Sequence, residues 1–410
     1  MDYSARIAKI EESKTIAVST AANKLTAAGE DVVSFGAGEP DFPTPDFIIE
    51  AAVEGMKKGY TGYTSASGLP ELKEAAVTKF AADYSHQYST DEVIVCNGGK
   101  QVLFNGLSAI LEEGDEVLIP KPYWVSYPEL VKLAGGKPVL IETKAENKYK
   151  VKAEELRNAI SKNTKAVIIN SPSNPDGHFY SASELEELIG VLIERDIFII
   201  SDEIYDKLLY DNKEFKSMIE LFPQLKDKLL VVNGMSKSYS MTGWRVGFGF
   251  ANQEWIKNMA KIQSHTTSNV NTIAQYASAK ALANDQLKEI IKERRDVYQQ
   301  RRDLTAELLA EIKGLKAIKP AGAFYFFIDI SELKGRKING EKIDGSLSFA
   351  DLLLQEKKVA VVPGIAFGMD DFVRISFALG EERIEEGIKR IKDFVAVSYT
   401  HLTLPTIYSV

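Results

Sequence analysis

One lysine and one arginine stand eight residues apart in GMSKSYSMTGWRVGFGF, residues 234–250, a segment that contains no carboxylate. Lys237 lies among small and hydroxylated residues, and Arg245 follows it. A lysine must be uncharged to attack a carbonyl carbon, and a neighbouring carboxylate would hold its proton. An arginine without a carboxylate partner is free to bind an anionic group of a ligand. The segment therefore predicts nucleophilic chemistry at Lys237 beside an anion site at Arg245.

Polar residues also follow other apolar runs of the chain. Asp202 stands directly after DIFIIS, and Tyr205 comes three residues later. Asn174 follows KAVIIN, within the segment SPSNPDG, and Lys237 follows LLVVNG. Ligands of open α/β sheets bind beyond the carboxyl ends of the strands, so we expect these side chains to meet at one edge of a sheet.

A glycine pair follows a further apolar run, in VIVCNGGKQ. We expect Gly98 and Gly99 to begin a helix at the other end of the sheet and to offer backbone N–H groups to an anion. Each feature has an ordinary explanation as well: an N-cap for Asp202, a turn residue for Asn174, a solvated loop residue for Lys237 and a tight turn for GGK. The functional interpretation rests on the whole set, because single short motifs often match by chance.

Short apolar runs alternate with amphipathic stretches, which is typical of a mostly parallel sheet wrapped by helices. Six runs lack polar alternation, as strands buried on both faces do: VIVC, EVLIP, KPVLIE, KAVIIN, DIFIIS and LLVVNG. Helical patterns lie between them, including SASELEELIGVLIERD, in which Ser183 and Glu186 match a capping box. The sequence therefore predicts an α/β fold.

The chain has 410 residues, enough for two domains or one large α/β unit. A long charged helical stretch beginning at Asp285 leads to three further strand-like segments, AFYFFIDI, VAVVPG and FVRISFA. We expect a large domain over residues 46–295. A smaller α/β domain would then be built from both chain ends, residues 1–45 and 296–395.

The composition limits the possible partners. The formal net charge of −8 provides no overall basic field for nucleic acid or an anionic membrane, so local groups must hold any anionic ligand. Cys96 is the only cysteine, which excludes an intramolecular disulfide and fits a reducing cytoplasm. The four histidines lack the spacing of metal ligands, and we expect no metal. The N-terminus lacks the apolar core of a signal peptide, and no run reaches the length of a membrane span.

The candidate residues together suit one kind of ligand. The ligand would be a cationic heteroaromatic ring that carries an aldehyde and a phosphate. Such a ligand matches the acid and the lysine at neighbouring strand ends, the arginine and the glycine-rich helix start. Pyridoxal phosphate is such a ligand, and it requires a lysine for covalent attachment and an acid facing its ring nitrogen.

The segment GMSKSYSMTGWRVG resembles the pyridoxal-phosphate attachment signature of class I aminotransferases, with Lys237 at the attachment lysine and Arg245 at the phosphate-binding arginine. Seven other segments fall where that family has its corresponding blocks, in the same order: FGAGEPDFPTP, YTSASGLPELK, PYWVSYPE, NSPSNPDG, SDEIY, GAFY and VRISFA. The resemblance extends from residue 1 to about residue 395 and is closest to the bacterial aspartate aminotransferase subgroup Ib. It implies the fold-type-I architecture of pyridoxal-phosphate-dependent transferases.

This resemblance implies roles in cofactor binding and catalysis. Lys237 would bind the cofactor covalently and then move a proton between the substrate Cα and the cofactor, while Asp202 would keep the ring nitrogen protonated. Asn174 and Tyr205 would hydrogen-bond the phenolic oxygen. Trp124 would stack on the ring, and a core position is its alternative. The phosphate would be bound by Gly98, Gly99, the Lys100 backbone and Arg245, with Tyr63 reaching in from a second subunit.

The resemblance also implies a substrate site. Arg374 in VRISFA would bind the α-carboxylate as a fork, assisted by the Gly38 backbone, with Trp124 and Asn174 beside it. A distal carboxylate needs another group, because HTTSNVNTIAQ lacks the arginine that subgroup Ia supplies across the dimer. Lys100 is our candidate, assisted by Ser13. The alternative is that Lys100 only adds positive charge near the phosphate.

Two departures from the family pattern bear on the choice of amino donor. Asp176 replaces the Thr of the usual NPTG, which keeps the turn but changes the local charge. Glu12 stands where the subgroup often has Pro, and Lys14 occupies the neighbouring variable position. The N-terminal segment can close over the site, so both changes concern substrate preference.

We therefore expect a cytoplasmic homodimer with shared active sites that transfers an amino group from L-aspartate to 2-oxoglutarate by a ping-pong mechanism. Aromatic amino acids or prephenate-type donors are the alternative within the family. A β-lyase, which diverts the same carbanion, is the alternative from another reaction class.

The last fourteen residues, VSYTHLTLPTIYSV, contain no Lys, Arg, Asp or Glu. This loss of charge and of helical periodicity predicts that residues 396–410 form a non-native tail outside the fold. VSYTHLTLPT also resembles translated sequencing-adapter read-through. A β-rich docking tail is the alternative.

Overall fold

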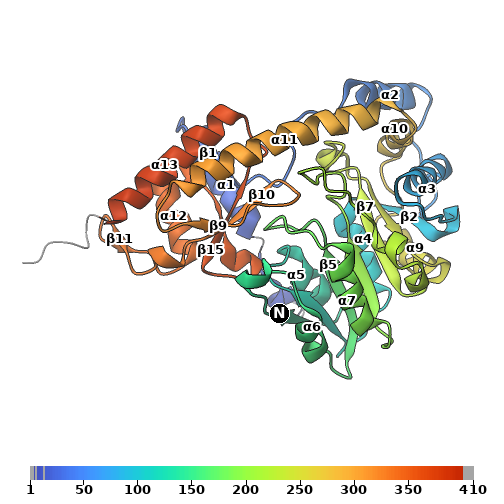
Figure 1. Ribbon diagram of the computed structural model, residues 1–410. Coiled ribbons are helices and arrows are strands. Elements are labelled where there is room, and N and C mark those ends of the chain that lie inside the picture. The colour runs from blue at the N-terminus through green and yellow to red at the C-terminus, as the bar shows by residue number, and fades with distance from the viewer. Residues whose placement is uncertain (1–3, 5–6, 13, 400–410) are drawn as a thin grey trace, which may run out of the picture.

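The computed structural model of the protein describes residues 4, 7–12 and 14–399, which form a large and a smaller unit (Figure 1). A seven-stranded sheet lies at the centre of the large unit. Its strands are β2 (Val93–Cys96), β3 (Glu116–Pro120), β4 (Lys137–Ile141), β5 (Thr164–Asn170), β6 (Phe198–Asp202), β7 (Leu229–Gly234) and β8 (Gly247–Phe250). Their order is β2-β8-β7-β6-β5-β3-β4, and only β8 runs antiparallel to its neighbours in this sheet. The predicted mostly parallel sheet is confirmed.

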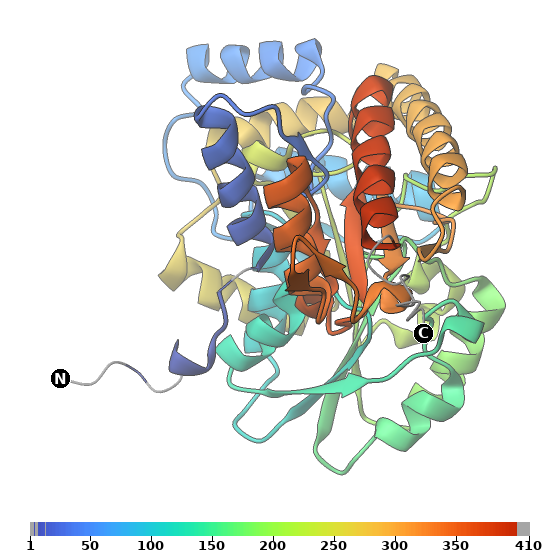
Figure 2. The ribbon, with the colours of Figure 1, turned by 90° about the vertical axis from the view of Figure 1, so that its left-hand side faces the viewer.

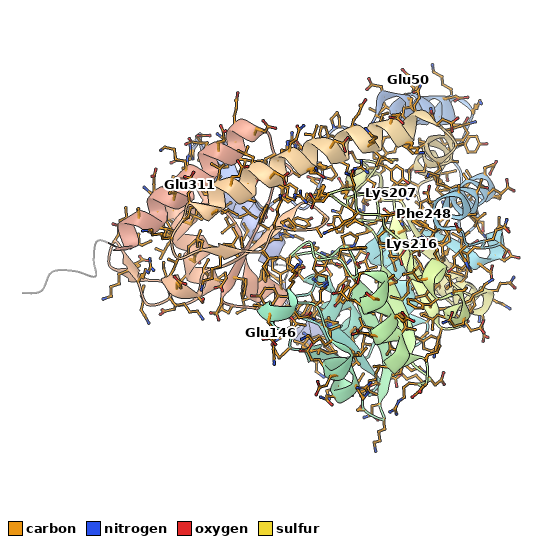
Figure 3. The ribbon with its side chains drawn as sticks, in the orientation of Figure 1. Glu50, Glu146, Lys207, Lys216, Phe248 and Glu311 are labelled. Atoms are coloured by element: carbon orange, nitrogen blue, oxygen red, sulfur yellow. The ribbon has the colours of Figure 1, made fainter. Side chains whose placement is uncertain are left out.

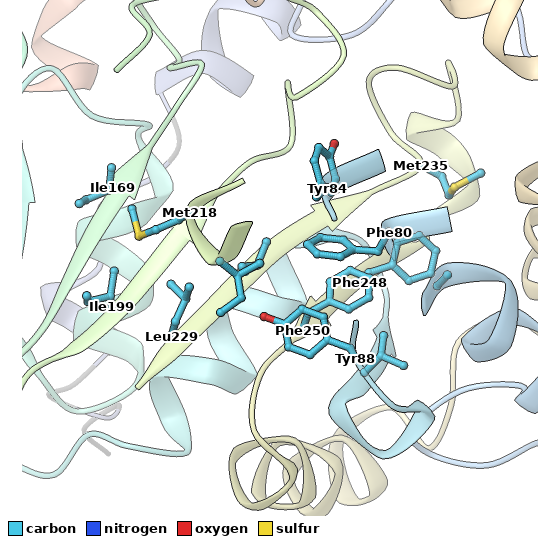
Figure 4. Close-up of a cluster of buried hydrophobic side chains, with 14 of the residues drawn as sticks. Phe80, Tyr84, Tyr88, Ile169, Ile199, Met218, Leu229, Met235, Phe248 and Phe250 are labelled. Atoms are coloured by element: carbon cyan, nitrogen blue, oxygen red, sulfur yellow. The ribbon is translucent and has the colours of Figure 1, made fainter. Parts of the chain in front are cut away.

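Alternate residues of the strands in this sheet face opposite layers of helices. In β2, Val93 and Val95 belong to one buried cluster, whereas Ile94 and Cys96 belong to the other. Figure 4 shows part of the first cluster, including Phe80 and the two phenylalanines of β8. Complete burial of such a side chain contributes roughly 1.5–3 kcal/mol, and burial on both faces explains why the strands read as unbroken apolar runs.

Helices cover both faces of this sheet (Figures 1 and 2). One face carries α4 (Gly99–Ser108), α5 (Ser126–Leu133) and α9 (Gln253–Thr266). The opposite face carries α2 (Asp46–Lys57), α3 (Pro70–Tyr84), α6 (Ala153–Ala159), α7 (Ala182–Leu192), α8 (Met218–Leu221) and α10 (Thr272–Leu282).

The start of α7 differs from the sequence-based prediction. Ser181 is its N-cap and accepts a hydrogen bond from the Glu184 backbone, while the Glu184 carboxylate accepts one from the Ser181 backbone. The prediction that Ser183 and Glu186 form the capping box is therefore wrong. Both pairs have the same spacing, and the pair that begins where the preceding chain is still extended forms the cap.

Both chain ends contribute to the smaller unit. Its four-stranded antiparallel sheet has the order β14 (Val362–Pro363), β15 (Phe372–Ser376), β10 (Tyr325–Asp329) and β9 (Lys316–Ala317). From the N-terminal end, β1 (Val33–Ser34) pairs in parallel with β13 (Val359–Ala360). The hairpin β11 (Lys337–Ile338) and β12 (Glu341–Lys342) and the helices α1 (Lys14–Ala27), α12 (Ser346–Lys357) and α13 (Glu381–Tyr399) complete the unit. The predicted smaller α/β part made from both ends is confirmed.

A single long helix, α11 (Gln286–Ala310), extends from the large unit to the smaller one and packs beside α13 (Figure 2). It continues past residue 295, where the sequence suggests that the large domain ends. The domain bounds 46–295 and 296–395 therefore remain a proposal. Short 3-10 helices lie at Ile7–Lys9, Thr90–Glu92, Ala145–Asn147, Pro223–Leu225, Thr242–Trp244, Ser331–Leu333 and Gly364–Phe367.

The end of α13 corrects one expectation. The helix continues to Tyr399, so the predicted loss of helical structure from residue 397 is wrong for its first three residues. A helix already anchored by buried Phe394 and Val395 extends at little cost, because each added residue gains a hydrogen bond. Residues 400–410 lie outside the described part of the chain. Within that part, the longest helices are too polar to cross a membrane.

Candidate active site

A cavity of about 580 Å³ lies beyond the carboxyl ends of the central strands, as the sequence predicts for a ligand site. Its walls come from α1, from the loop before α2, from the strand ends of the large unit and from β10 and β15. Ten of the predicted site residues line it: Gly38, Gly99, Lys100, Trp124, Asn174, Asp202, Tyr205, Lys237, Arg245 and Arg374. The structure therefore brings together residues that are separated by up to 336 positions, from Gly38 to Arg374.

Lys237 follows β7 and is half-buried, with its Nζ atom donating a hydrogen bond to the Gly38 carbonyl. Burial lowers the pKa of Lys237 to about 8, and the charges of Arg374 and Arg245 act in the same direction, against Glu39. Among the described residues, no carboxylate forms an ion pair with this amine. A substantial neutral fraction at ordinary pH follows, and a nucleophilic amine requires that fraction.

Asp202 ends β6 and is almost completely buried. Tyr127 donates a hydrogen bond to its Oδ2 atom at 2.7 Å, and the backbone N–H of Ile204 reaches Oδ1 at 3.3 Å. Burial raises the pKa of Asp202 to about 6, although these hydrogen bonds and the charge of Lys237 favour the ionised form. A cationic partner inside the cavity would complete this site by stabilising the carboxylate.

Arg374 lies on β15, buried between aromatic rings. Its Nη1 atom donates to Oδ1 of Asn174 and its Nη2 atom to the carbonyl of Gly36, both at 3.0 Å. The Tyr325 ring lies 4.3 Å from the guanidinium carbon, measured to the ring centroid. The buried Nε atom has no hydrogen-bond partner among the described residues. Such an arginine can accept a carboxylate in its fork, which offsets the cost of burying the charge.

Asn174 and Tyr205 line the cavity in different local surroundings. The Asn174 backbone donates to Oδ1 of Asn170, which fixes the turn that follows β5. The Tyr205 hydroxyl lies 2.9 Å from the Tyr325 hydroxyl. The two predicted partners of a phenolic oxygen thus already form hydrogen bonds within the protein, Tyr205 with Tyr325 and Asn174 with Arg374.

A glycine-rich junction forms the anion side of the cavity. Gly98 has a φ of +82°, and a Cβ atom there would lie 2.6 Å from Nη2 of Arg245. A Cβ atom on Gly247 of β8 would lie 2.4 Å from the Gly98 carbonyl carbon. Only glycine permits this close approach of strand, helix start and arginine. The first N–H groups of α4, beginning at Gly99, therefore lie next to Arg245 and form an anion cradle.

The position of this cradle in the sheet corrects the sequence-based expectation. We expected VIVCNGGKQ at the other end of the sheet from Asp202 and Lys237. In the structure β2 is a lateral edge strand, and β8 pairs antiparallel with both β2 and β7, so β2 and β7 run in the same direction. Their carboxyl ends consequently reach the same cavity.

Lys100, one residue into α4, lies over the Trp124 ring, with its Nζ atom 5.0 Å from the ring centroid. Burial and the charge of Arg245 both lower the pKa of Lys100. Trp124 is partly buried at the cavity wall, so its ring is available both to the lysine and to a ligand.

Three predicted residues are placed differently from the rest. Tyr63 is 92% exposed and lies outside the cavity lining, so its expected contribution across a dimer stays a prediction. Gly98 supports the cradle from behind without lining the cavity. Ser13 lies outside the described residues.

Several residues that hold the predicted ones in place were not predicted from the sequence. Tyr127 bonds Asp202, Tyr325 bonds Tyr205, and Thr242 donates to Glu39 at 2.7 Å, which ties the segment after Lys237 to the loop that carries Gly38. Tyr127 and Tyr325 belong to PYWVSYPE and GAFY, two of the segments that resemble the family, so the sequence contained a signal for both residues. Helix α1 also lines the cavity through Ile16, Ser19, Thr20 and Asn23. We expected the N-terminal segment to close over the site, but these four residues were not predicted.

Comparison with known proteins identifies the family. The model of the family "Aminotransferase class I and II" matches residues 30–391. The chain belongs to this family. The resemblance noted in the sequence is confirmed, and the protein is a pyridoxal-phosphate-dependent aminotransferase.

Individual aminotransferases match over nearly the whole chain. The aspartate aminotransferase of Bacillus subtilis (strain 168) is 45% identical over 395 residues, covering 96% of this chain and 99% of the relative. A probable aspartate/prephenate aminotransferase of Aquifex aeolicus is 43% identical over 387 residues, covering 94% and 97%. The solved structure of aspartate aminotransferase from Thermus thermophilus with maleate has a TM-score of 0.90 and 40% identity, covering 96% and 100%.

The residues of this aminotransferase cavity fit its cofactor. Asp202 is a buried acid that forms no ion pair among the residues the structure describes, and the protonated ring nitrogen of pyridoxal phosphate would supply a cationic partner. The Gly99 cradle and Arg245 both line the cavity and supply N–H donors and positive charge for the phosphate, and glycine at position 98 allows Arg245 to approach the cradle. Lys237 is the cavity amine whose pKa is lowered to about 8.

Proposed function

We propose that the protein transfers the amino group of L-aspartate to 2-oxoglutarate by a ping-pong mechanism. One observation carries the choice of a dicarboxylic substrate: the cavity contains a further basic side chain, Lys100, in addition to Lys237, Arg374 and the phosphate-binding Arg245. The names of the Bacillus and Thermus relatives support aspartate, and the structure of the Thermus protein is described with maleate, a dicarboxylate.

When bound, pyridoxal phosphate supplies an electron sink for the electron pair left at the substrate Cα. We assign its covalent attachment to Lys237, whose Nζ atom would then take the proton from Cα and return it on the cofactor side. Asp202 would hold the ring nitrogen protonated, because a carboxylate fixed by Tyr127 favours a cation beside it. Gly99, the Lys100 backbone, Arg245 and the partner subunit's Tyr63 would bind the phosphate.

The substrate would be oriented by groups on both units of the chain. Arg374 would bind the α-carboxylate with its free Nε and fork, and Asn174 and the Gly38 backbone would border that position. Trp124 would cover the ring face. Lys100, with Ser13, would bind the distal carboxylate. Because these groups come from both units, substrate binding favours a closed arrangement of the two units.

Donors with aromatic side chains or prephenate-type structure are the second candidate. The name of the Aquifex relative, probable aspartate/prephenate aminotransferase, favours it. In that case Trp124 and the apolar part of α1 would contact the side chain. A β-lyase is a weaker candidate from a different reaction class.

A panel of amino donors with 2-oxoglutarate tests the proposal, scored for the keto acid and for ammonia. Aspartate should give oxaloacetate with the highest kcat/KM and no ammonia. A higher value for aromatic donors would replace the proposal by its alternative, and ammonia release in place of glutamate would indicate a lyase.

We further propose a homodimer with shared active sites, located in the cytoplasm. Exposed Ile49, Val53 and Met56 of α2 support an apolar contact surface on the large unit, on the same unit as Tyr63. The single buried Cys96 supports a reducing compartment. We propose domain bounds at residues 45/46 and 295/296.

A further inference from the structure

A second cavity, of about 500 Å³, lies between the two units, and we call it the inter-unit cavity. The large unit contributes residues 148–150, the start of α7 and residues 213–216, whereas the smaller unit contributes residues 318–321 and Phe327 of β10. Figure 3 labels Lys216, which lines it, and Glu146, in the turn before Lys148. The inter-unit cavity shares no lining residue with the active-site cavity, and its volume is that of a small-molecule site.

The charges around the inter-unit cavity favour an anion. Its lining contains five lysines and three carboxylates: Lys148, Lys150, Lys213, Lys216 and Lys319 against Asp176, Glu184 and Glu214. Within the described part of the chain, Lys148 and Lys213 form no ion pair.

The cavity carboxylates are largely engaged. Asp176 already accepts hydrogen bonds from Ser173 and His178, and Glu184 pairs with Lys150. The N-terminus of α7 adds partial positive charge to the cavity wall. An incoming anion would therefore meet the unpaired ammonium groups of Lys148 and Lys213, opposed by the carboxylate of Glu214, while the α7 N-terminus is already capped by Ser181 and Glu184.

The remaining wall is apolar and aromatic. Phe179, Leu221, Pro320 and Phe327 line it, together with the rings of Tyr149 and Tyr180. The Tyr149 ring lies edge-on to Phe372 at 5.3 Å, and Phe372 stacks on Phe327 at 4.7 Å between centroids. Aromatic rings prefer such offset and edge contacts, so a planar ring in the ligand would extend this stack.

The backbone at the cavity is strained. Lys148 and Tyr149 have φ values of 53° and 56°, so two consecutive residues with large side chains adopt the left-handed conformation. Strain of this kind persists where the surrounding structure enforces it, and it is concentrated at ligand-binding sites. This left-handed backbone places the unpaired ammonium group of Lys148 and the ring of Tyr149 on the same wall of the cavity.

The walls of the inter-unit cavity connect to the substrate carboxylate site. Asp176 stands two residues after Asn174, whose Oδ1 atom accepts from Arg374. On the other wall, Phe327 pairs with Arg374 in the register between β10 and β15. Any shift of either wall therefore moves one partner of the Arg374–Asn174 hydrogen bond.

We propose that the inter-unit cavity is a regulatory site for an aromatic carboxylate, and that its occupancy changes the affinity of the active site for dicarboxylates. The two effects must be reciprocal, because a coupling free energy between two sites acts equally in both directions. The regulatory part rests on the proposed function, because maleate reports on an active site that binds dicarboxylates, whereas the Lys148 and Lys213 variants test the inter-unit cavity itself.

Calorimetric titration of the holoenzyme with 1-naphthoate tests the proposal, with saturating maleate present to fill the active site. One molecule per chain should bind, and the double variant Lys148→Ala/Lys213→Ala should weaken binding by about tenfold or more, the cost of losing charge-assisted contacts. The matched control Lys144→Ala/Lys162→Ala removes two exposed lysines outside both cavities and should leave binding unchanged. Without saturation, naphthoate and maleate should change each other's affinity by one common factor.

Equal naphthoate affinity in the double variant and its control, or complete displacement by maleate, would overturn the site. Two further ligands test the anionic and the aromatic requirement separately. Inorganic phosphate is an anion without a ring, and 1-naphthalenemethanol has the ring without the charge. Each should bind at least tenfold more weakly than naphthoate; phosphate binding of equal strength would overturn the aromatic requirement, and equal binding of the neutral alcohol would overturn the anionic one. Independent binding of naphthoate and maleate would overturn the regulatory part.

Discussion

At the residue scale, the reactivity of Lys237 is set by its surroundings. Burial lowers its pKa from the usual 10.5 to about 8, so the neutral amine becomes abundant as the pH rises through about 8. In cofactor-free protein, the rate of covalent pyridoxal phosphate attachment should therefore rise with pH to a midpoint near this value, because only the neutral amine attacks the aldehyde. Rapid-mixing absorbance measurements across the pH range provide the check.

The same measurement on Arg374→Gln isolates one cause. Among the charges that lower the pKa of Lys237, that of Arg374 has the largest effect. Removing this charge should therefore move the midpoint of the attachment rate to higher pH. A midpoint near 10.5 in the unaltered protein would show that the cavity does not favour the neutral amine.

Lys100 decides between a substrate role and a cofactor role. Loss of a charge-assisted contact is worth roughly 1.5–3 kcal/mol, or about one to two orders of magnitude in specificity. Lys100→Ala should cost that much in kcat/KM for aspartate and 2-oxoglutarate, and little for an aromatic donor measured by single turnover. Lys165→Ala is a matched control, since its ammonium group also lies over a ring, that of Phe198, outside the cavity.

Equal losses for every donor in Lys100→Ala would assign the lysine to the phosphate. The preference for aspartate would then lose its main physical support, although the aminotransferase family would not be affected.

At the element scale, α13 separates the folded chain from the residues that follow. Phe394 and Val395 are 1% and 2% exposed, whereas Val397 is 40% exposed. A chain ending at Val395 should keep its activity and its melting temperature within error. A chain ending at Lys392 should lose at least about 3 kcal/mol of stability, the cost of removing a buried phenylalanine.

Thermal and urea unfolding of both truncated proteins give the two values. A marked loss of stability on ending at Val395 would mean that residues 396–410 pack against the fold, in favour of a docking tail. No loss on ending at Lys392 would contradict the burial of Phe394.

At the scale of the whole molecule, Tyr63 lies exposed on the large unit, and we expect it to reach the active site of a second subunit. If Tyr63 completes a neighbouring active site, then mixing inactive Tyr63→Ala and Lys237→Ala chains should restore some activity. In a mixed dimer, one site contains both native residues, so up to half of its sites are complete. Activity after verified subunit exchange is the measurement, with each variant alone as the control.

Persistently inactive mixtures, with exchange shown by mass spectrometry, would count against shared sites. The binding of naphthoate at the inter-unit cavity would still be measurable in that case, since the residues that line that cavity belong to one chain.

The sequence by itself determined the strands and the chemistry of the residues that follow them. Strands buried on both faces require continuous apolar runs, and Asp202, Asn174 and Lys237 follow such runs, so their positions were readable locally. Motif order then indicated the family, because a series of short segments in one order is far more specific than any single segment.

Only the tertiary structure decided how distant groups meet. Local patterns contain no information on strand order, so the shared direction of β2 and β7, which brings the Gly99 cradle to Lys237, could not be predicted. Nor could the capping pair of α7, since Ser181 with Glu184 and Ser183 with Glu186 have identical spacing. The pKa values of Lys237 and Asp202, and the inter-unit cavity, arise from burial between segments far apart in the chain, and burial is a property of the packed molecule alone.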